Sequence, residues 1–232
     1  MSTSAPRSGS PAVLFDIDGT LVDTNFLHAL AWRRAFLDAG LDVPTAWVHR
    51  RIGMGASTLI QELVGHDRPD VKDNWRRHFE RLKPEVRALP GAADLLRAVA
   101  SRGVKVVLAS SSEEEDLEAL LQAIAADDVV DCVTSAGDVE EAKPSPEVFT
   151  TALAKAGCGP ERALVLGDTV WDVKAAGAAG LACVGVLTGG VSAAELADAG
   201  AVAVYDDARA LVAALDDSPL ARLFEPAAGP AG

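Results

Sequence analysis

Polar side chains follow the apolar segments of this sequence that are predicted to form buried strands. Each segment is followed, directly or after a loop, by groups suited to binding phosphate or metal: Asp16 and Asp18, Ser110 and Ser111, Lys143, and Asp168 with Asp172. Ligands bind outside the carboxyl ends of the strands in an open parallel sheet. We therefore expect these side chains to converge on one edge of a sheet.

Aspartates gathered at that edge would repel one another and raise each other's pKa values. A hard cation among them would remove the repulsion. Mg²⁺ fits because it takes oxygen ligands and leaves positions for water and substrate phosphate. Lys143 adds a compact positive charge that can hold a phosphate. The hydroxyl of Ser110 and the amides near the helix start at Ser112 can receive phosphate oxygens.

The first two aspartates have the spacing needed for phosphoryl transfer. Asp16 can attack phosphorus and form an aspartyl-phosphate, which divides one difficult step into two. Asp18 can protonate the leaving oxygen and then take a proton from the attacking water. The metal and Lys143 would stabilise charge on the transferred group, where most of the catalytic effect in phosphoryl transfer lies.

The elements that must position these groups are visible as short apolar runs. Such runs predict strands at 12–15, 104–109, 129–134, 163–166, 181–187 and 201–204. From Pro90 onward, amphipathic helical patterns alternate with them. This alternation predicts an α/β fold, a Rossmann-like doubly wound parallel sheet with helices on both faces.

The segment 22–88 interrupts this alternation with helical patterns and no convincing strand. We interpret it as an inserted α-helical cap, and 11–21 with 89–224 as the Rossmann-like catalytic core. The ends, 1–10 and 225–232, are interpreted as disordered tails.

The first helix of the predicted cap has two apolar faces, one with Phe26, Leu30 and Leu37 and the other with His28 and Trp32. A helix of this kind could pack on its own bundle with one face and cover a site with the other.

Four cap residues are candidates for contact with a substrate: His28, Trp32, Arg51 and Gly53. His28 and Trp32 could equally serve cap packing. Arg51 belongs to a basic pair that could simply be solvated, and Gly53 opens a glycine loop. The segment should close over the site and exclude water during transfer.

Composition excludes several classes of partner. The chain has 232 residues and a formal net charge of −13, which disfavours a nucleic-acid backbone as partner. No apolar run is long enough to predict a membrane-spanning helix. Cys132, Cys158 and Cys183 are widely spaced, and this pattern favours a reducing cytoplasm over a disulfide framework or a zinc site.

Four segments, FDIDGTLVDT, LASSS, AKPSPEVF and GDTVWD, resemble in order and spacing the four motifs of the haloacid dehalogenase superfamily. The helical cap is similar to that of phosphoglycolate phosphatases and β-phosphoglucomutases. The resemblance implies that Asp16 is nucleophile and metal ligand, and that Asp18 is acid/base and binds metal through its main-chain carbonyl. It also implies that Ser110 and Lys143 bind phosphate, that Asp168 is a metal ligand, and that Asp172 is a ligand or a support.

Departures from the family patterns narrow the activity. Dehalogenases lack the second aspartate of the first motif, so Asp18 argues against dehalogenation. Phosphonatases use a cap lysine, but no lysine lies between Val22 and Val71, and Thr58 stands near its expected place. β-Phosphoglucomutases share the His28 and Trp32 pattern. They also carry an arginine just after the cap glycine loop, where this chain has none.

The sequence therefore predicts a Mg²⁺-dependent phosphatase that acts on a small phosphorylated metabolite, either a sugar phosphate or a phosphoglycolate-like ester. A sugar-phosphate mutase is the alternative within the family, and a non-catalytic binding protein or receiver-type protein is a distant one. We expect a cytoplasmic monomer or homodimer with no nucleic-acid or membrane partner.

Overall fold

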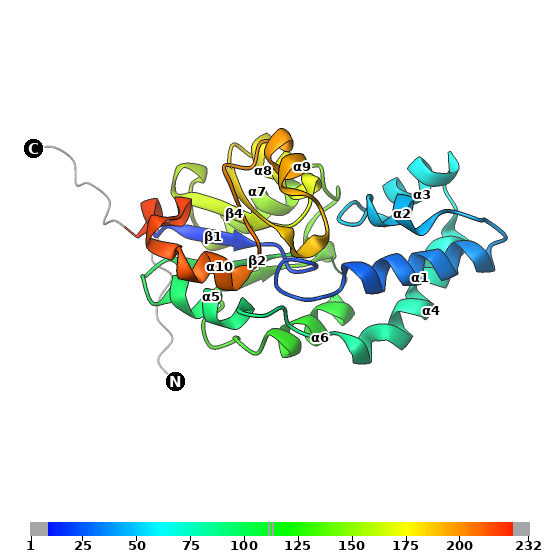
Figure 1. Ribbon diagram of the computed structural model, residues 1–232, viewed down its shortest axis with the longest axis horizontal. Helices are drawn as coiled ribbons and strands as arrows, with labels where there is room; N and C mark the ends of the chain where they lie inside the picture. Colours follow the sequence, from blue (N-terminus) through cyan, green and yellow to red (C-terminus); the bar gives the residue numbers. More distant parts are fainter. Residues whose placement is uncertain (1–8, 111, 113, 225–232) are drawn as a thin grey trace, which may run out of the picture.

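Six parallel strands form one sheet at the centre of the part of the chain that the structure describes (Figure 1). This computed structural model describes residues 9–110, 112 and 114–224. The strands are β1 (Ala12–Phe15), β2 (Lys105–Ala109), β3 (Cys132–Thr134), β4 (Ala163–Gly167), β5 (Ala182–Val186) and β6 (Ala203–Tyr205). Their spatial order, β3-β2-β1-β4-β5-β6, is that of the Rossmann fold. The predicted fold class is confirmed.

The strand order changes direction at β1, which lies between β2 and β4 with parallel register on both sides. Phe15 is level with Leu108 of β2 and with Leu166 of β4. The carboxyl ends of these three strands therefore lie side by side at the switch point where α/β sheets bind ligands. The sequence places aspartates or a serine directly after each of them.

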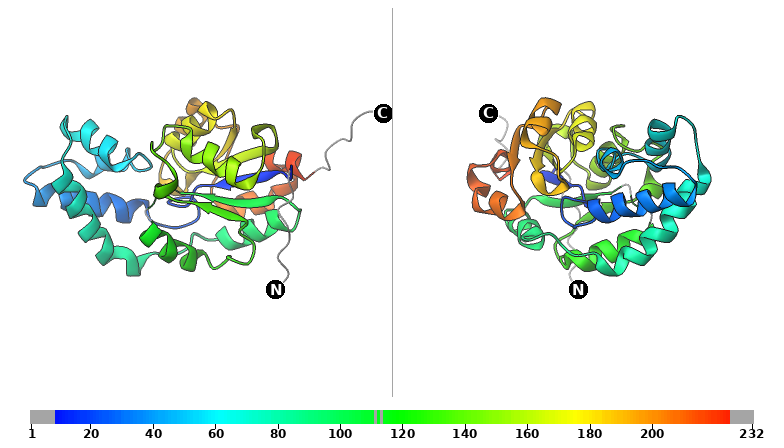
Figure 2. Two further views of the ribbon diagram at one scale, coloured as in Figure 1. Left: turned by 180° about the vertical axis from the view of Figure 1, so that it is seen from behind. Right: turned by 45° about the vertical axis from the view of Figure 1, so that its right-hand side comes forward.

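Helices cover both faces of the sheet, as the alternation in the sequence predicts (Figure 2). One face carries α5 (Ala92–Ala100), α6 (Glu114–Ile124) and α10 (Ala208–Ala213), and the other carries α7 (Glu147–Ala156), α8 (Val170–Ala178) and α9 (Ala193–Ala199). Successive side chains of β1 alternate between the two cores: Phe15 belongs to the first and Leu14 to the second. Both are fully buried, which stabilises the fold by about 1.5–3 kcal/mol for each side chain.

Short 3₁₀ turns complete the chain. They are η1 (Lys83–Glu85), η2 (Ala136–Asp138), η3 (Pro160–Arg162), η4 (Leu187–Gly189), η5 (Leu215–Asp217) and η6 (Pro219–Leu223). The edge strands β3 and β6 are shorter than the apolar runs that predict them. None of the described helices is long and apolar enough to cross a membrane.

Four helices lie between β1 and α5 and form a separate layer at one end of the molecule (Figure 1). They are α1 (Asn25–Asp38), α2 (Thr45–His49), α3 (Ala56–Val64) and α4 (Pro69–Leu82). They enclose their own apolar core, to which Trp32 and Phe36 of α1, Ile60 of α3 and Val71 of α4 contribute. The structure thus has a helical insertion where the sequence predicts a cap.

The two apolar faces of α1 differ in burial. Phe26, Leu30 and Leu37 lie outside the apolar core of the inserted helices; Phe26 is 59% exposed, and its ring stacks on His49 of α2. The buried residues of α1 are instead Asn25, Ala29, Ala31, Trp32, Ala35 and Phe36. The reason is that α4, its main partner, lies against the side that carries Trp32.

Two chain segments connect the helical layer to the sheet. They pair with each other: Val22 and Ala88 form an antiparallel bridge, and the Asp23 amide donates to the Arg87 carbonyl (2.9 Å). The chain therefore enters and leaves the insertion through two adjacent segments. The boundaries of the cap (22–88) and of the catalytic core (11–21 and 89–224) remain predictions. Of the predicted tails, 1–8 and 225–232 lie outside the described residues.

Candidate active site

A tight turn after β1 presents Asp16 and Asp18 at the edge of the sheet. The amides of Thr20, Leu21 and Val22 all donate to the carbonyl of Ile17, which reverses the chain directly beyond the strand. Gly19 has a φ of +78°, and a Cβ there would come within 2.4 Å of Asp168 Oδ2. Only glycine suits this position, because it tolerates positive φ and leaves room for the carboxylate.

Three carboxylates meet beneath this turn. Oxygen atoms of Asp16, Asp168 and Asp172 all lie within 4.8 Å of one another. Asp16 is 6% exposed, and the other two are more deeply buried. Asp168 is placed by the end of β4 and Asp172 by the first turn of α8. The predicted convergence at the carboxyl edge of the sheet is present in the structure.

Lys143 lies between two of these carboxylates, although the chain reaches it only through a loop after β3. Its ammonium group forms ion pairs with Asp16 Oδ1 and with Asp172 Oδ1, the latter at 2.7 Å. Lys143 is 2% exposed. Burial alone would lower the pKa of Lys143, but the two adjacent carboxylates raise it above its usual value. Lys143 therefore remains charged.

The environment of Asp16 favours its protonated form. Burial, with the negative charges of Asp172 and Asp18, raises the pKa of Asp16 to about 7 despite the opposing charge of Lys143. Burial also raises the pKa of Asp168 well above its usual range. A divalent cation would stabilise both carboxylates as anions. Buried oxygen donors with this spacing fit Mg²⁺, which prefers carboxylates and water.

Asp18 lies in a different environment, although only one residue separates it from Asp16. Its side chain accepts hydrogen bonds from Thr24 Oγ1 (2.6 Å) and Ser112 Oγ (2.9 Å), and His28 Nε2 lies 3.2 Å away. Burial alone would raise the pKa of Asp18, but His28 and the two hydroxyls lower it to about 2. Asp18 is therefore held as a carboxylate that neighbouring side chains orient.

Both carboxylate oxygens of Asp172 have partners within this arrangement. Its Oδ2 accepts hydrogen bonds from the amide (2.9 Å) and the hydroxyl (2.6 Å) of Thr169, which forms a capping box at the start of α8. Its Oδ1 faces Lys143. Asp172 therefore anchors both the helix and the lysine.

A cavity of about 820 Å³ lies between this edge of the sheet and the inserted helices. Asp16, Asp18 and Lys143 line it on the core side. Of the four candidate cap residues, His28, Trp32 and Gly53 line it on the other side. Arg51 is not among its lining residues, because its guanidinium group pairs with Glu62 (3.0 Å) on the outside of the inserted helices.

The serines after β2 are placed less directly. Ser110 is buried and accepts a hydrogen bond from the amide of Ser112 (3.0 Å), but it does not line the cavity. Ser111 lies outside the described residues. Ser112 lines the cavity, and its contact with Asp18 is not predicted by its interpretation as a helix cap.

Several residues at the site were missed by the sequence analysis. Lys72 and Trp75 of α4 line the cavity, and Trp75 stacks on Trp32 at a centroid distance of 5.0 Å. Thr20 and Asn25 both donate hydrogen bonds to Asp168. Lys72 and Trp75 lie in a helix whose charged pattern suggests a solvated surface. Nothing in the sequence around Asn25, apart from its position at a helix start, indicates a contact with the site.

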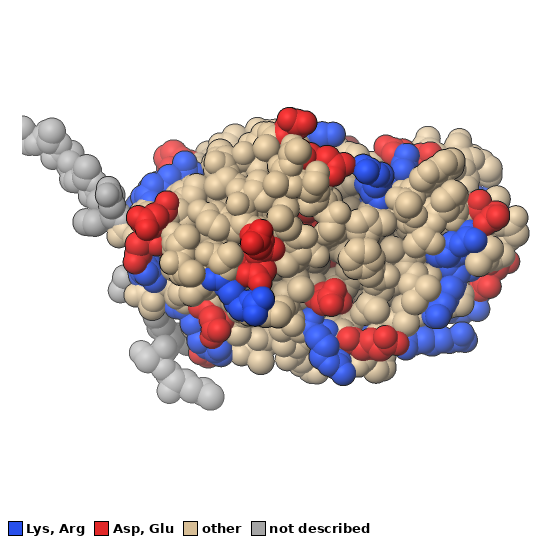
Figure 3. All heavy atoms as spheres, viewed as in Figure 1, with Lys and Arg blue, Asp and Glu red and all other residues tan. Residues whose placement is uncertain are grey.

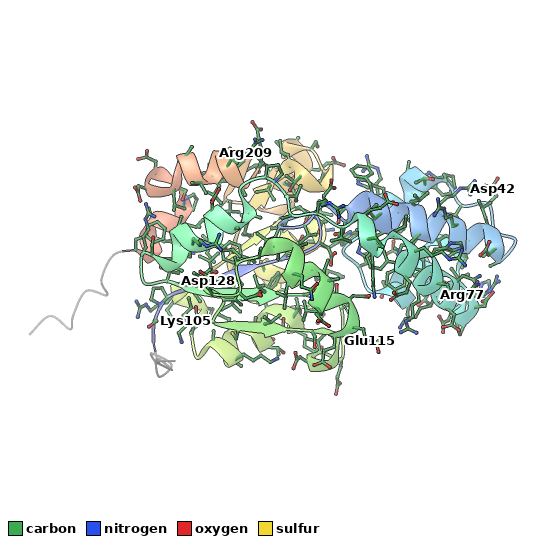
Figure 4. The ribbon with its side chains drawn as sticks, turned by 90° about the horizontal axis from the view of Figure 1, so that it is seen from below. Asp42, Arg77, Lys105, Glu115, Asp128 and Arg209 are labelled. Carbon is green, nitrogen blue, oxygen red and sulfur yellow. The ribbon has the colours of Figure 1, made fainter. Side chains whose placement is uncertain are left out.

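The inserted helices contact the core on either side of the cavity. His49 Nε2 of α2 donates to the carbonyl of Gly189 (2.9 Å), and the His49 ring stacks on Phe26. Across the molecule, Lys83 pairs with Asp116 of α6 (2.5 Å). In Figure 4, the labelled Asp42 and Arg77 lie in the insertion, and Lys105, Asp128 and Arg209 lie on the core.

A doubly wound sheet with a buried acidic cluster at its switch point and a helical insertion above it defines a capped hydrolase. The family model of haloacid dehalogenase-like hydrolases matches residues 11–180. The chain therefore belongs to this family and is an enzyme of the phosphoric monoester hydrolase class.

The relatives of known name agree with this assignment. A phosphoglycolate phosphatase from Rhodospirillum rubrum is 34% identical over 212 residues, which are 84% of this chain and 87% of the relative. A hydrolase from Pseudomonas syringae has a similar crystal structure, with a TM-score of 0.84, 30% identity and coverage of 90% and 99% of the two chains. A variant of CbbY from Rhodobacter sphaeroides, in complex with xylulose-1,5-bisphosphate, has a TM-score of 0.71 and 27% identity, with coverage of 87% and 96%.

Proposed function

We propose that this protein is a Mg²⁺-dependent phosphatase that hydrolyses a small organic phosphate monoester through an aspartyl-phosphate on Asp16. One observation carries the proposal. A buried carboxylate that is paired with Lys143 and a second carboxylate with its own hydrogen-bonding partners line the same cavity. Nucleophilic attack and proton transfer can thus be assigned to different groups.

Asp16, Asp168 and the main-chain carbonyl of Asp18 would hold Mg²⁺, with Asp172 as support. The cation would supply charge stabilisation to the phosphoryl oxygens and keep the nearby carboxylates ionised. Lys143, held charged by its buried ion pairs, would stabilise the transferred group from the protein side.

The reaction begins when a carboxylate oxygen of Asp16 attacks phosphorus and the bond to the leaving alcohol breaks. Asp18 gives a proton to the leaving oxygen. In the second half, Asp18 accepts a proton from water as the water attacks the aspartyl-phosphate, which releases inorganic phosphate and restores Asp16. Asp18 must therefore be protonated when substrate is bound. A phosphate dianion beside it would raise its pKa in the required direction.

The cavity is large enough to hold a sugar phosphate or a smaller phosphate ester. Its volume of about 820 Å³ is ample for a phosphorylated sugar. Lys72 lines it, and none of the ion pairs found among the described residues includes Lys72. A second anionic group of the substrate could use this charge. The names of the relatives support substrates of both sizes: one is a phosphoglycolate phosphatase, and CbbY was crystallised with a sugar bisphosphate.

We also propose that the enzyme acts in the cytoplasm. Its three cysteines are free thiols, which suits a reducing compartment.

The test is a phosphate-release screen over sugar phosphates, phosphoglycolate, polyol phosphates and nucleotides, with and without Mg²⁺. We expect release only with Mg²⁺, and a loss of at least about 10³-fold in Asp16→Asn, which removes the nucleophile. Acid quenching should trap a phosphoryl group on the wild-type chain. Asp198→Asn, an exposed aspartate of α9, is the matched control.

Full activity in Asp16→Asn would exclude the mechanism. Comparing the phosphate released with the substrate consumed distinguishes a phosphatase from a mutase. A phosphatase releases one phosphate for each substrate consumed, whereas a mutase converts substrate into an isomer and releases little phosphate.

A further inference from the structure

We propose that Asn25 is a positioning residue that orients the Asp168 carboxylate and links this orientation to the placement of the inserted helices. Asn25 Nδ2 donates to Asp168 Oδ2 (2.7 Å), and Thr20 Oγ1 donates to Asp168 Oδ1 (2.7 Å). Both carboxylate oxygens are therefore held by neutral donors. The inference rests on the proposed function in one respect, that Asp168 is a metal ligand.

The surrounding backbone leaves space for this one hydrogen bond. A Cβ at Gly19 would lie 2.3 Å from Asn25 Nδ2, and a Cβ at Gly189 would lie 1.8 Å from Asp168 Oδ2 and 2.9 Å from Asn25 Nδ2. Two loops that are distant in the sequence thus lack side chains where the amide meets the carboxylate. Gly189 does not have a positive φ, so its small size matters here for space rather than for backbone conformation.

Asn25 is 2% exposed, yet its Oδ1 has no hydrogen-bond partner among the described residues. A buried acceptor without a partner is unfavourable. An amide with the opposite orientation would place its oxygen against Asp168 Oδ2, which is worse still. The side chain is therefore poorly suited to a purely stabilising role. Its one productive contact is the one to Asp168.

The position of Asn25 in the chain connects this contact to the inserted helices. Asn25 is the first residue of α1, and the preceding Thr24 donates to Asp18 Oδ1 (2.6 Å). Consecutive residues at the entrance to the insertion therefore hold two different aspartates of the site. From the far side, His49 of α2 donates to the carbonyl of Gly189, which packs on the same amide–carboxylate pair. Movement of the inserted helices would disturb Asp168 through both connections.

The experiment is calorimetric titration of the substrate-free full-length protein with Mg²⁺. Asn25→Leu removes the donor and keeps the volume, and we expect about tenfold weaker Mg²⁺ binding because a hydrogen bond to a charged group is lost. Gly189→Ala keeps both partners and obstructs their contact, so it should weaken Mg²⁺ binding in the same direction. The thermal unfolding midpoint of Asn25→Leu should not fall, since an unpaired buried oxygen is removed as well.

Two matched variants serve as controls. Asn74→Ala removes an amide that donates to the Ala35 carbonyl within the inserted helices, and Gly177→Ala adds a methyl group where no atom lies within 4 Å. Both should bind Mg²⁺ as the wild type does. Unchanged Mg²⁺ affinity in folded Asn25→Leu and Gly189→Ala would overturn the inference. A purely structural role would lower the unfolding midpoint of Asn25→Leu and leave the affinity of the folded protein unchanged. Failure of the phosphatase screen would instead overturn the proposed activity and leave this result standing.

Discussion

Asp16 and Asp18 lie two positions apart in the chain and yet have opposite acid–base properties. Burial raises the pKa of Asp16 to about 7, whereas His28, Thr24 and Ser112 bring that of Asp18 to about 2 against the effect of its own burial. Neighbouring residues of a tight turn point to different surroundings, so each carboxylate takes the properties of the side chains that it meets. In the proposed mechanism both states must change: Mg²⁺ would keep Asp16 ionised, and a bound phosphate would raise the pKa of Asp18 so that it can donate a proton.

Lys143 provides the first prediction at the residue scale. Lys143→Met leaves Asp16 and Asp172 buried without their shared counter-charge. Removing one partner of a buried ion pair costs about 3–5 kcal/mol. We expect a loss of that size in the free energy of unfolding, measured by urea denaturation in the presence of a chelator. Mg²⁺ should restore part of it, because the cation replaces the missing charge.

The matched control for this variant is Lys155→Met. Lys155 pairs with Asp138 (2.6 Å) near the surface, and such pairs contribute about 0–1 kcal/mol. If the two variants lose the same amount of stability, Lys143 does not hold the acidic cluster together.

At the scale of elements, α1 and α2 connect the inserted helices to the acidic site. The first residues of α1 bind two aspartates, and α2 contacts the core through His49 and Gly189. The amphipathic pattern of α1 located the helix correctly but left open which of its two apolar faces packs on the other inserted helices, because the pattern cannot reveal on which side the partner helix lies.

His49→Ala should loosen the contact between α2 and the core. The hydrogen bond to Gly189 and the stacking on Phe26 are both lost, and one neutral hydrogen bond contributes about 0.5–1.5 kcal/mol. We expect KM to rise about three- to tenfold, and amide hydrogens of α2 and α3 to exchange faster, while the unfolding midpoint of the core changes little.

His66→Ala is the control for this variant, since His66 contacts only the carbonyl of Val64 within the inserted helices among the interactions described here. Equal effects of the two substitutions on KM and on exchange would show that His49 has no special part in closure.

At the scale of the whole molecule, the net charge of −13 is spread over the surface, while the acidic cluster at the site is buried. On the face shown in Figure 3, Lys and Arg alternate with Asp and Glu. The general surface field therefore says little about the substrate. Under the proposed function, the local charges of Lys143, Lys72 and Mg²⁺ would decide which anion can enter.

The buried cluster leads to a prediction about pH. Without metal, the raised pKa of Asp16 means that the folded protein binds more protons than the unfolded chain between about pH 4 and 7. Metal-free stability should therefore fall as pH rises through that window. Mg²⁺ favours the ionised carboxylates, so the increase in unfolding midpoint caused by Mg²⁺ should be larger at pH 7.5 than at pH 5.

Scanning calorimetry across this pH range, with chelator and with Mg²⁺, measures the effect. Repeating it at high NaCl separates the buried cluster from surface repulsion, because salt screens exposed charges much more than buried ones. An increase that is the same at pH 5 and pH 7.5 would contradict the prediction.

The sequence alone was sufficient to predict the fold class and the segments from which the site is drawn. Apolar runs of strand length, alternating helices and polar residues directly after the strands are local features. Parallel pairing then requires that the ends of β1, β2 and β4 lie together. For that reason Asp16, Asp18 and Asp168 could be named in advance, and Lys143 could be placed near them. Their catalytic and metal-binding roles stay predictions.

Other features were decided by the tertiary structure. Neither the Asn25 contact with Asp168 nor the ion pair between Lys143 and Asp172 has a local pattern, since each joins residues whose approach depends on how the inserted helices and the loops pack. The same holds for Arg51, which faces Glu62, and for Lys72, which faces the cavity. In the sequence, a charged residue of a surface helix looks the same whether its side chain faces solvent or a binding cavity. Only the packing of the helix determines which of the two it faces.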